Sequence, residues 1–483
     1  MINFRVILQI TGILLIIEAI AIVLSVPVAL YYHESSYFYL LISAIITGLT
    51  GLILRYTNQK QKHSTVTKRE GYIIVSISWI IFSLFGALPF FLSGEIPHFT
   101  DAFFETISGF TTTGATILQD IEAMSKGMLF WRSMTQWLGG MGIIVLSLAV
   151  LPILGIGGMQ LFFAEVPGPT PDKLHPRIKE TAKRLWAIYL ILTLAQIVLL
   201  IAGGLNVFDA VCHAFTTMAT GGYSTKQASI AYYDSPFVQY VFIVFMFLAG
   251  TNFTLSYFAM HLRFDKILKN EEFRFYTLLI LGFSLLIGLV LYFGGHLKGE
   301  PAFRHALFQV VSIMTTTGYA TMDYLLWPPL VVLLIFMLMF VGGSAGSTGG
   351  GIKVLRVMLL LKNSILEFKR LIHPNAIVQV RLSNNTVQPE VITNILAFVS
   401  IYLIITVTGM ITVSAMGYDL ATSAGAVAAT LGNIGPGLGM VGPVAVYAHF
   451  PDFGKWFLSF LMLIGRLELF TVLILFSKSF WKK

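Results

Sequence analysis

Four segments rich in threonine and glycine recur along this chain, and each follows a short apolar stretch. Backbone carbonyl and hydroxyl oxygens can replace the water shell of a cation in a narrow pore. Four copies in one chain therefore predict a pseudo-fourfold ring of oxygen ligands, which makes the chain a candidate potassium pore. The segments are Phe110–Thr116, Met218–Ser224, Met314–Thr321 and Leu431–Gly439, with Gly114, Gly221, Gly318 and Gly435 taken as equivalent positions spaced by 107, 97 and 117 residues.

The glycines in these segments have a physical explanation. Carbonyl groups that all face one axis need backbone angles that residues with a Cβ adopt only at a cost, and a narrow pore leaves no room for side chains. Non-helical backbone inside a membrane is tolerated where it lines water or is buried in protein. An ordinary turn or a helix-packing motif would explain one such segment, but four segments with matching flanks favour the pore.

The composition is that of a polytopic membrane protein. Of 483 residues, 56% are hydrophobic and 11% are charged, whereas soluble domains carry about a quarter charged residues. The single Cys212 excludes an internal disulfide framework and a cysteine-rich metal site. The ten histidines show no metal-binding spacing, and no nucleophile stands in a pattern with a base. We therefore expect neither an enzyme, nor a tightly bound cofactor, nor a nucleic-acid partner.

The apolar stretches predict ten membrane spans, because a hydrocarbon core of about 30 Å needs about 20 apolar helical residues. The stretch after Arg5 is too long for the core of a signal peptide, so we retain it as a span. An even number of spans places both termini on one side. The spans are Ile7–Leu30, Tyr37–Leu54, Gly71–Ser93, Met128–Leu151, Leu185–Gly203, Phe237–Met260, Tyr276–Phe293, Leu330–Leu361, Val391–Ala415 and Phe457–Ser477.

Lys and Arg are distributed unequally between the two sides of these spans. One side holds 24 of the 31, and the positive-inside rule makes it cytoplasmic. Both termini are then cytoplasmic, and the four turns open outward. The outer side holds 12 acidic and 5 basic residues, so we expect it to attract cations.

The sequence predicts that each repeat consists of a span, a short pore helix, the turn and a second span. Asp101, Asp209 and Asp419 stand near the start of three pore helices, where a carboxylate satisfies free N–H groups and opposes the positive end of the helix dipole. In the third repeat Pro301 can open the helix, but Arg304 is unfavourable there. We expect an all-α membrane protein in which two N-terminal transmembrane helices precede four pseudo-symmetric helix–pore loop–helix repeats around one central pore. The predicted boundaries are 1–69 for the accessory helices and 70–183, 184–273, 274–389 and 390–483 for the repeats, the third of which carries a broken helix.

These turns and the repeated pattern of two spans and a pore loop resemble the Trk/Ktr/HKT superfamily of potassium transporters over essentially the whole chain. The length, the two extra N-terminal spans and the local motifs look most like its bacterial TrkH pore subunits. The resemblance implies gated potassium uptake across the inner membrane, a homodimer in membrane lipid and a cytosolic TrkA-like regulatory ring. K⁺ is then the transported ion, and nucleotide is expected on the regulatory partner rather than on this chain.

The resemblance also assigns a selectivity filter position by position. Relatives that favour sodium tend to carry serine at the first glycine, so Gly114 argues for potassium. The fourth segment matches most loosely, because Gly432 also fits the spacing from Asp419. The implied filter residues are Thr111, Thr112, Thr113, Gly114, Ala219, Thr220, Gly221, Thr316, Thr317, Gly318, Asn433, Ile434 and Gly435.

A glycine-rich segment, Val341–Lys353, interrupts the eighth predicted span. It does not fit a nucleotide-binding loop, because Ile352 separates the last glycine from Lys353 and no serine or threonine follows the lysine. Glycines in mid-span favour a broken helix that lines a cavity over a flexible helix-packing segment. The resemblance implies a gating loop beneath the filter, formed by Gly346, Ser347, Thr348, Gly349, Gly350, Gly351 and Lys353 together with Arg466.

Arg466 lies within the last predicted span, where a charge is costly and normally faces water or the protein interior. We favour a pore-facing role as an electrostatic barrier, which the resemblance supports, over pairing with Glu468. Within the pore helices, Glu105 and His213 are expected to serve in packing or in polar networks. The loop Pro167–Pro176 is stiff, and it is either a docking segment for a soluble partner or a solvated linker.

An ion-coupled secondary transporter with alternating access is the alternative to a pore. Such a transporter, driven by H⁺ or Na⁺, is expected to have inverted repeats and an ionisable coupling site at mid-membrane. The repeats here share one orientation and contain few such residues, which favours passive, gated flux. A membrane-embedded enzyme is a more distant alternative, because the sequence shows no clustered catalytic residues.

Overall fold

The computed structural model describes residues 2–58, 67–142, 178–376, 378–383 and 385–482. Helices dominate this part of the chain. Its strands are the two-residue β1 (Arg381–Leu382) and β2 (Asn385–Thr386), which pair antiparallel. The predicted all-α membrane fold is therefore confirmed, whereas the loop Pro167–Pro176 lies outside the described residues.

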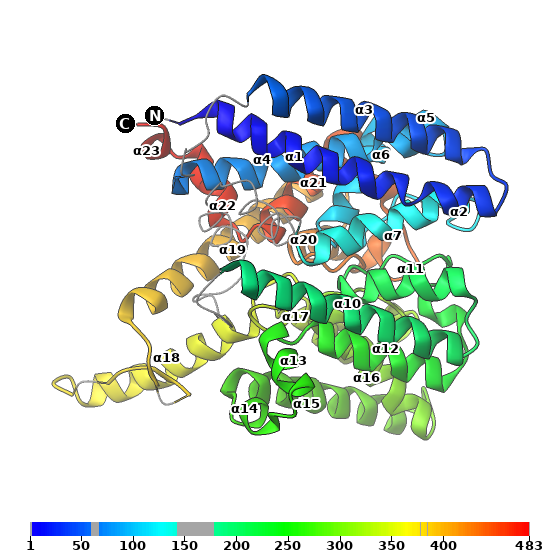
Figure 1. Ribbon diagram of the computed structural model, residues 1–483. Helices are drawn as coiled ribbons and strands as arrows, with labels where there is room; N and C mark the ends of the chain where they lie inside the picture. Colours follow the sequence, from blue (N-terminus) through cyan, green and yellow to red (C-terminus); the bar gives the residue numbers. More distant parts are fainter. Residues whose placement is uncertain (1, 59–66, 143–177, 377, 384, 483) are drawn as a thin grey trace.

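The N-terminal helices are α1 (Phe4–Val23), α2 (Val26–Tyr31) and α3 (Ser36–Thr57). The first and third lie side by side along one edge of the molecule (Figure 1). Their backbones approach closely, because a methyl group on Gly12 would lie 2.6 Å from the carbonyl oxygen of Gly51. The first predicted span is divided between α1 and α2, since a proline in the first turn of α2 cannot donate a backbone hydrogen bond.

Four repeats of one design follow, each with a long helix, a pore helix, a turn and a further helix. The first contains α4 (Lys68–Gly86), α5 (Leu88–Ser93), α6 (Phe99–Phe110) and α7 (Lys126–Gly140). The second contains α10 (Ile178–Ala202), α11 (Val207–Met218), the 3₁₀ turn η2 (Ser229–Tyr232), α12 (Pro236–Ala249), α13 (Phe253–Met260) and α14 (Phe264–Leu268). The third contains α15 (Glu271–Phe293), α16 (Glu300–Met314), η3 (Tyr324–Leu326), α17 (Pro329–Leu338) and α18 (Val354–Ile372). The fourth contains α19 (Pro389–Ala415), α20 (Leu420–Leu431), η4 (Gly439–Val441), η5 (Tyr447–His449), α21 (Asp452–Arg466), α22 (Phe470–Leu473), η6 (Ile474–Phe476) and α23 (Lys478–Trp481).

The spans differ from the sequence prediction in continuity. Among the described residues, 6 helices are long and apolar enough to cross a membrane, or 8 when two sharply bent pairs are included. The predicted spans Phe237–Met260 and Phe457–Ser477 are these pairs, bent by 110° and 111°. The interruption predicted for the span Leu330–Leu361 is present, because α17 ends at Leu338, residues 339–353 are not helical and α18 begins at Val354. Only the beginning of Met128–Leu151 lies within the described residues.

The two ends of the described chain meet at the start of α4. The backbone N–H of Asn3 donates to Glu70 Oε1 at 2.8 Å, and Arg69 Nη1 donates to the Lys482 carbonyl at 2.8 Å. Figure 1 shows both ends at the same end of the helix bundle, as an even number of spans requires. At the lower left of that view, α18 projects away from the bundle, so the broken third repeat continues outside the packed core.

The pore helices begin in four different ways. Asp419 caps α20 by accepting from the Thr422 N–H at 3.4 Å, as the sequence suggested. In α11 the cap is Asn206, which accepts from the Asp209 N–H at 2.7 Å. Asp101 forms an ion pair with Lys455 of the fourth repeat at 2.5 Å. The expected aspartates are therefore present near the helix starts, but they differ in role. Asp419 caps its helix, whereas Asp101 pairs with a lysine of another repeat.

The third pore helix compensates for its arginine. Glu300 occupies the first turn of α16, where its charge favours the helix dipole, and it lies 3.1 Å from Arg304 Nε. Nη1 of the same guanidinium donates to Gln239 Oε1 of the second repeat at 3.0 Å. The asymmetry predicted for this repeat thus produces a contact between neighbouring repeats.

Candidate functional site

The four turns have the same backbone shape, which fixes their register. The second residue after each pore helix has a positive φ of 54° to 60°, and a glycine two positions further has a positive φ of 75° to 95°. The first set is Thr112, Thr220, Thr316 and Asn433, and the second is Gly114, Gly222, Gly318 and Gly435. The equivalence assumed for Gly221 was therefore wrong by one position, because the left-handed backbone angle that favours glycine falls at Gly222. In the fourth turn Gly435, rather than Gly432, has this backbone angle.

These glycines close a ring in which each repeat lies against the next. A methyl group on Gly114 would lie 2.2 Å from the Gly221 carbonyl oxygen of the second repeat. In the same order, a methyl group on Gly222 would lie 1.9 Å from the Thr317 carbonyl oxygen, one on Gly318 would lie 1.9 Å from the Ile434 carbonyl oxygen, and one on Gly435 would lie 2.7 Å from the Thr113 carbonyl oxygen. No side chain fits at any of these contacts, so the four turns surround one axis at the closest approach that backbone allows.

The side chains of the turns form short hydrogen bonds around this ring. The hydroxyls of Thr111 and Thr113 are 2.8 Å apart, and those of Thr315 and Thr317 repeat the contact at 2.8 Å. Asn433 Nδ2 donates to Thr113 Oγ1 at 2.9 Å, which joins the fourth turn to the first. Thr315 was missed in the sequence, although its place before Thr316 in a run of three threonines was the available signal.

A cavity of about 70 Å³ opens on one side of the ring and is lined by all four glycines that share the positive φ. Lys226 also lines it, and its Nζ lies 3.3 Å from Glu122 Oε2. Because the pore helices end on the opposite side of the ring, this cavity is the mouth into which the turns open. Gly221 is not among the residues found to line it, which agrees with the corrected register.

The glycine-rich segment 339–353 lies against the other side of the ring. The Gly350 N–H donates to Thr316 Oγ1 of the third turn at 2.7 Å, and Thr348 Oγ1 donates to the Met218 carbonyl of α11 at 3.1 Å. A methyl group on Gly350 would lie 2.5 Å from the Gly432 carbonyl of the fourth repeat. The segment therefore contacts three of the four repeats directly beneath their turns.

Arg466 completes this layer at the first repeat. Its Nη1 donates to Thr112 Oγ1 at 3.0 Å and to the Thr348 carbonyl at 2.6 Å. Its Nη2 donates to the carbonyls of Gly139 and Gly140 at 2.6 and 3.0 Å. Glu468, the carboxylate considered as its partner, forms an ion pair with Arg356 of α18. The guanidinium thus lies among backbone carbonyls under the ring, as the pore-facing alternative requires.

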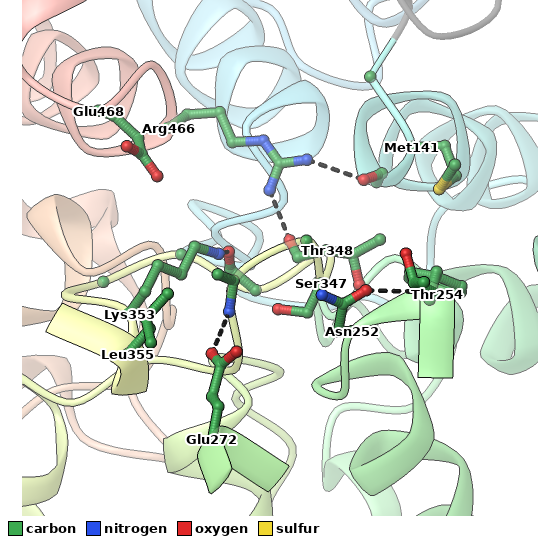
Figure 2. A pocket seen from close by; sticks show the side chains of 18 of the residues that line it. Met141, Asn252, Thr254, Glu272, Ser347, Thr348, Lys353, Leu355, Arg466 and Glu468 are labelled. Carbon is green, nitrogen blue, oxygen red and sulfur yellow. Dashed lines mark hydrogen bonds between the residues drawn. The ribbon is translucent and has the colours of Figure 1, made fainter. Parts of the chain in front are cut away.

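A second cavity of about 190 Å³ lies beneath this layer. Figure 2 shows Arg466, Lys353 and Glu272 converging on it from different elements. Lys353 Nζ donates to the Gly349 carbonyl, and Glu272 Oε1 accepts the Ala345 N–H at 2.6 Å. The predicted gate residues Gly346, Ser347, Thr348, Gly349, Gly350, Gly351 and Lys353 all line this cavity, together with Arg466. The loop and Arg466 therefore separate the two cavities.

Comparison with known proteins agrees with this architecture. The family model TrkH, described as a cation transport protein, matches residues 38–483. The Trk system potassium uptake protein TrkH of Salmonella typhimurium is 41% identical over 100% of both chains, and the Trk system potassium uptake protein TrkG of Escherichia coli is 37% identical over 99% of each. The crystal structure of the potassium transporter TrkH from Vibrio parahaemolyticus matches with a TM-score of 0.89 and 38% identity, over 99% of this chain and 100% of that one.

The resemblance inferred from the four turns is confirmed by these matches, which extend over the accessory helices and all four repeats. The family model covers residues 38–483, so α1, α2 and the first two residues of α3 lie outside its range. By its sequence and by its fold, the chain belongs to the TrkH family of cation transport proteins.

Proposed function

We propose that this chain is the pore subunit of a Trk-type potassium uptake system and that it conducts K⁺ passively through the ring of four turns. The observation that carries the proposal is the closed contact of each turn glycine with the carbonyl of the following repeat. Such a ring presents oxygen ligands to a dehydrated cation from four directions. Relatives named as Trk system potassium uptake proteins, aligned over the full length, support potassium as the ion.

The filter comprises the residues assigned from the sequence, with two additions from the register. Carbonyl and hydroxyl oxygens of these residues are the ion ligands, and Gly114 keeps the first turn free of a side chain. The acidic outer surface raises the cation concentration near the mouth. The set is Thr111, Thr112, Thr113, Gly114, Ala219, Thr220, Gly221, Gly222, Thr315, Thr316, Thr317, Gly318, Asn433, Ile434 and Gly435.

The segment 346–353 and Arg466 form the gate. Conduction requires that the loop leave its position against the third and fourth turns, because it separates the filter from the cavity beneath. Arg466 adds a positive charge below the filter and opposes the entry of a cation from that side. Two cooperating parts, one steric and one electrostatic, thus control the same opening.

The subunit acts in an assembly at the bacterial inner membrane. We propose a homodimer in the lipid bilayer, with both termini cytoplasmic and a TrkA-like ring bound on the cytosolic side. The basic loops and the common position of the two chain ends support this orientation. Nucleotide binds to the ring and not to this chain, which transports an ion without catalysing a reaction.

Recording from the purified protein in planar bilayers tests the proposal. Unitary currents whose reversal potential follows the potassium gradient in mixed K⁺ and Na⁺ are the expected result. Electroneutral flux with a fixed stoichiometry to H⁺ or Na⁺ would instead establish the alternative, an alternating-access transporter.

A further inference from the structure

One buried position behind the filter differs in every repeat. It lies nine residues before the filter glycine, at 105, 213, 309 and 426 relative to 114, 222, 318 and 435. The occupants are Glu105, His213, Gln309 and Ala426, and each has at most 1% of its surface exposed. In the first two repeats the side chain at this position contacts the segment that leaves the turn, so its chemistry affects how firmly that segment is held.

In the first repeat this position makes a dense set of contacts. The Glu105 carboxylate accepts the Ile117 N–H at 2.9 Å and the Thr116 hydroxyl at 2.9 and 3.0 Å. It also forms an ion pair with Arg132 Nε of α7 at 2.7 Å, in which the two side chains are 0% and 2% exposed. A buried charge with several donors is held firmly, because removing any partner leaves it unsatisfied.

Arg132 also contacts the second repeat. Its Nη1 donates to the Ser224 carbonyl at 3.0 Å, and its guanidinium lies 3.5 Å from the centre of the Tyr223 ring. The Tyr223 hydroxyl in turn donates to the Glu105 carbonyl at 2.6 Å. The segment leaving the second turn is therefore fixed to the first pore helix from two directions.

Gln136, one helical turn along α7 from Arg132, holds the same turn on its other side. Its Nε2 donates to the Gly221 carbonyl at 2.7 Å, and its Oε1 accepts the Tyr223 N–H at 3.0 Å. Residues four apart lie on one face of a helix. Arg132 and Gln136 on one face of α7 thus form hydrogen bonds to the second turn before and after Gly222.

The remaining repeats are held less firmly at this position. His213 bonds to the Ser224 hydroxyl at 3.0 Å and to the Asp209 carbonyl at 2.7 Å, within its own repeat. Both amide atoms of Gln309 lack a hydrogen-bond partner among the residues that the structure describes. The side chain of Ala426 has no polar atom with which to make one. Tyr319 repeats the Tyr223 contact by donating to the His213 carbonyl at 3.2 Å. The charged support at this position, however, lies between the first and second turns.

We propose that Glu105, Arg132 and Gln136 form a brace that fixes the distance between the first and second filter turns and thereby sets the discrimination between K⁺ and Na⁺. The smaller Na⁺ is bound well only if the oxygens of the ring move inward. A brace that resists this movement penalises Na⁺ and leaves K⁺ unaffected. This inference rests on the proposed function, because it assigns positioning residues to that filter.

Two substitutions on α7 test the brace. Arg132→Lys keeps a charge for Glu105 but lacks the planar fork that reaches Ser224 at the same time. Gln136→Met keeps the volume and removes both hydrogen bonds to the second turn. For each we expect the ratio of K⁺ to Na⁺ permeability, measured from the reversal potential, to fall about tenfold, which corresponds to about 1.4 kcal/mol.

Gln309→Met is the matched control, since it changes the equivalent position in the third repeat, where the amide has no partner in the described structure. Its permeability ratio is expected to equal that of the unmodified protein. If Arg132→Lys fails to fold, the result with Gln136→Met decides. Folded Arg132→Lys and Gln136→Met proteins with unchanged permeability ratios would overturn the brace while leaving the pore intact. An unmodified protein without potassium-selective current would overturn the proposed function itself.

Discussion

Arg466 and Thr112 are 354 residues apart in the sequence, yet a hydrogen bond of 3.0 Å joins the guanidinium to the threonine hydroxyl. The same nitrogen donates to the Thr348 carbonyl. The first filter turn and the loop beneath the filter therefore share one donor. Any movement of the loop that lengthens one of these bonds also changes the surroundings of the other, so the proposed gate and the proposed filter are physically linked at this residue.

Removing the guanidinium is expected to increase potassium flux. Arg466→Ala deletes the positive charge under the filter and the donors to Thr112 and Thr348. We expect roughly a tenfold rise in ⁸⁶Rb⁺ uptake by proteoliposomes, because a unit charge near a dehydrated cation is worth about 1 to 4 kcal/mol in partly solvated surroundings. Arg466→Lys retains the charge and should give an intermediate rate. Equal uptake by well-folded Arg466→Ala would show that the arginine is structural only.

The loop should open more often when its contact with the fourth repeat is blocked. Gly350→Ala places a methyl group 2.5 Å from the Gly432 carbonyl, and neither backbone can yield as a flexible side chain could. We expect a several-fold higher open probability in single-channel records with an unchanged K⁺ to Na⁺ ratio.

Gly282→Ala is the control for this substitution, because a methyl group there meets nothing within 4 Å. Its channel records should match those of the unmodified protein. A change in ion preference at Gly350 with normal gating would contradict the separation between gate and filter.

The corrected register predicts different consequences at two adjacent glycines. A side chain at Gly222 would meet the Thr317 carbonyl at 1.9 Å and would occupy a left-handed backbone angle, which costs about 1 to 2 kcal/mol by itself. At Gly221 the nearest atoms are those of the Gln136 amide, 2.4 Å away, so a side chain there disturbs the brace but meets no backbone. Gly222→Ser should therefore reduce the K⁺ to Na⁺ permeability ratio more than Gly221→Ser does. The reverse order, measured from reversal potentials, would restore the original alignment.

Acidity is expected to affect stability through a carboxyl group outside the spans. Glu95 accepts the Ser125 N–H and hydroxyl at 3.0 and 2.7 Å at the start of α7. Burial raises the pKa of Glu95 above its usual value of 4.5, although the bonds from Ser125 lower it. The folded protein then binds this proton more tightly than the unfolded chain does. Its contribution to stability therefore falls as the pH rises from the unfolded to the folded pKa.

Melting temperatures in detergent between about pH 4 and about pH 8 test this direction. The Tm of Glu95→Gln should increase relative to that of the unmodified protein as the pH rises through this window, in addition to any constant offset. Two melting curves that stay parallel across the whole range would show that the group does not titrate differently on folding.

Most of the fold followed from local sequence features. The length of the apolar stretches, the repeated turns and the distribution of Lys and Arg predicted the helices and the fourfold arrangement, because each depends on residues close together in the chain. The bends of 110° and 111° were not predictable in this way. They depend on how a span packs against neighbouring repeats, and the hydropathy of the span does not record that packing. The assumed repeat boundaries at 69, 183, 273 and 389 stay predictions.

Site positions that require glycine could be predicted from the sequence. Contacts between residues far apart in the sequence could not. Two adjacent glycines, Gly221 and Gly222, left the register of the second turn open, and only the backbone angles decided it. Arg132 was visible as a charge in a span, but its position between Glu105 and Ser224 needed the fold. The partner of Glu468 is likewise on α18, more than a hundred residues away in sequence, and its identity needed the fold.

The closed ring of turn glycines has a genetic consequence. In a channel built from four identical subunits, one codon change alters every quadrant of the filter together. Here each quadrant is encoded separately, so a single nucleotide substitution modifies one turn and reaches the others through the contacts between repeats. Ion preference in such a chain can change in small steps during evolution, with three unaltered quadrants preserving conduction at every step.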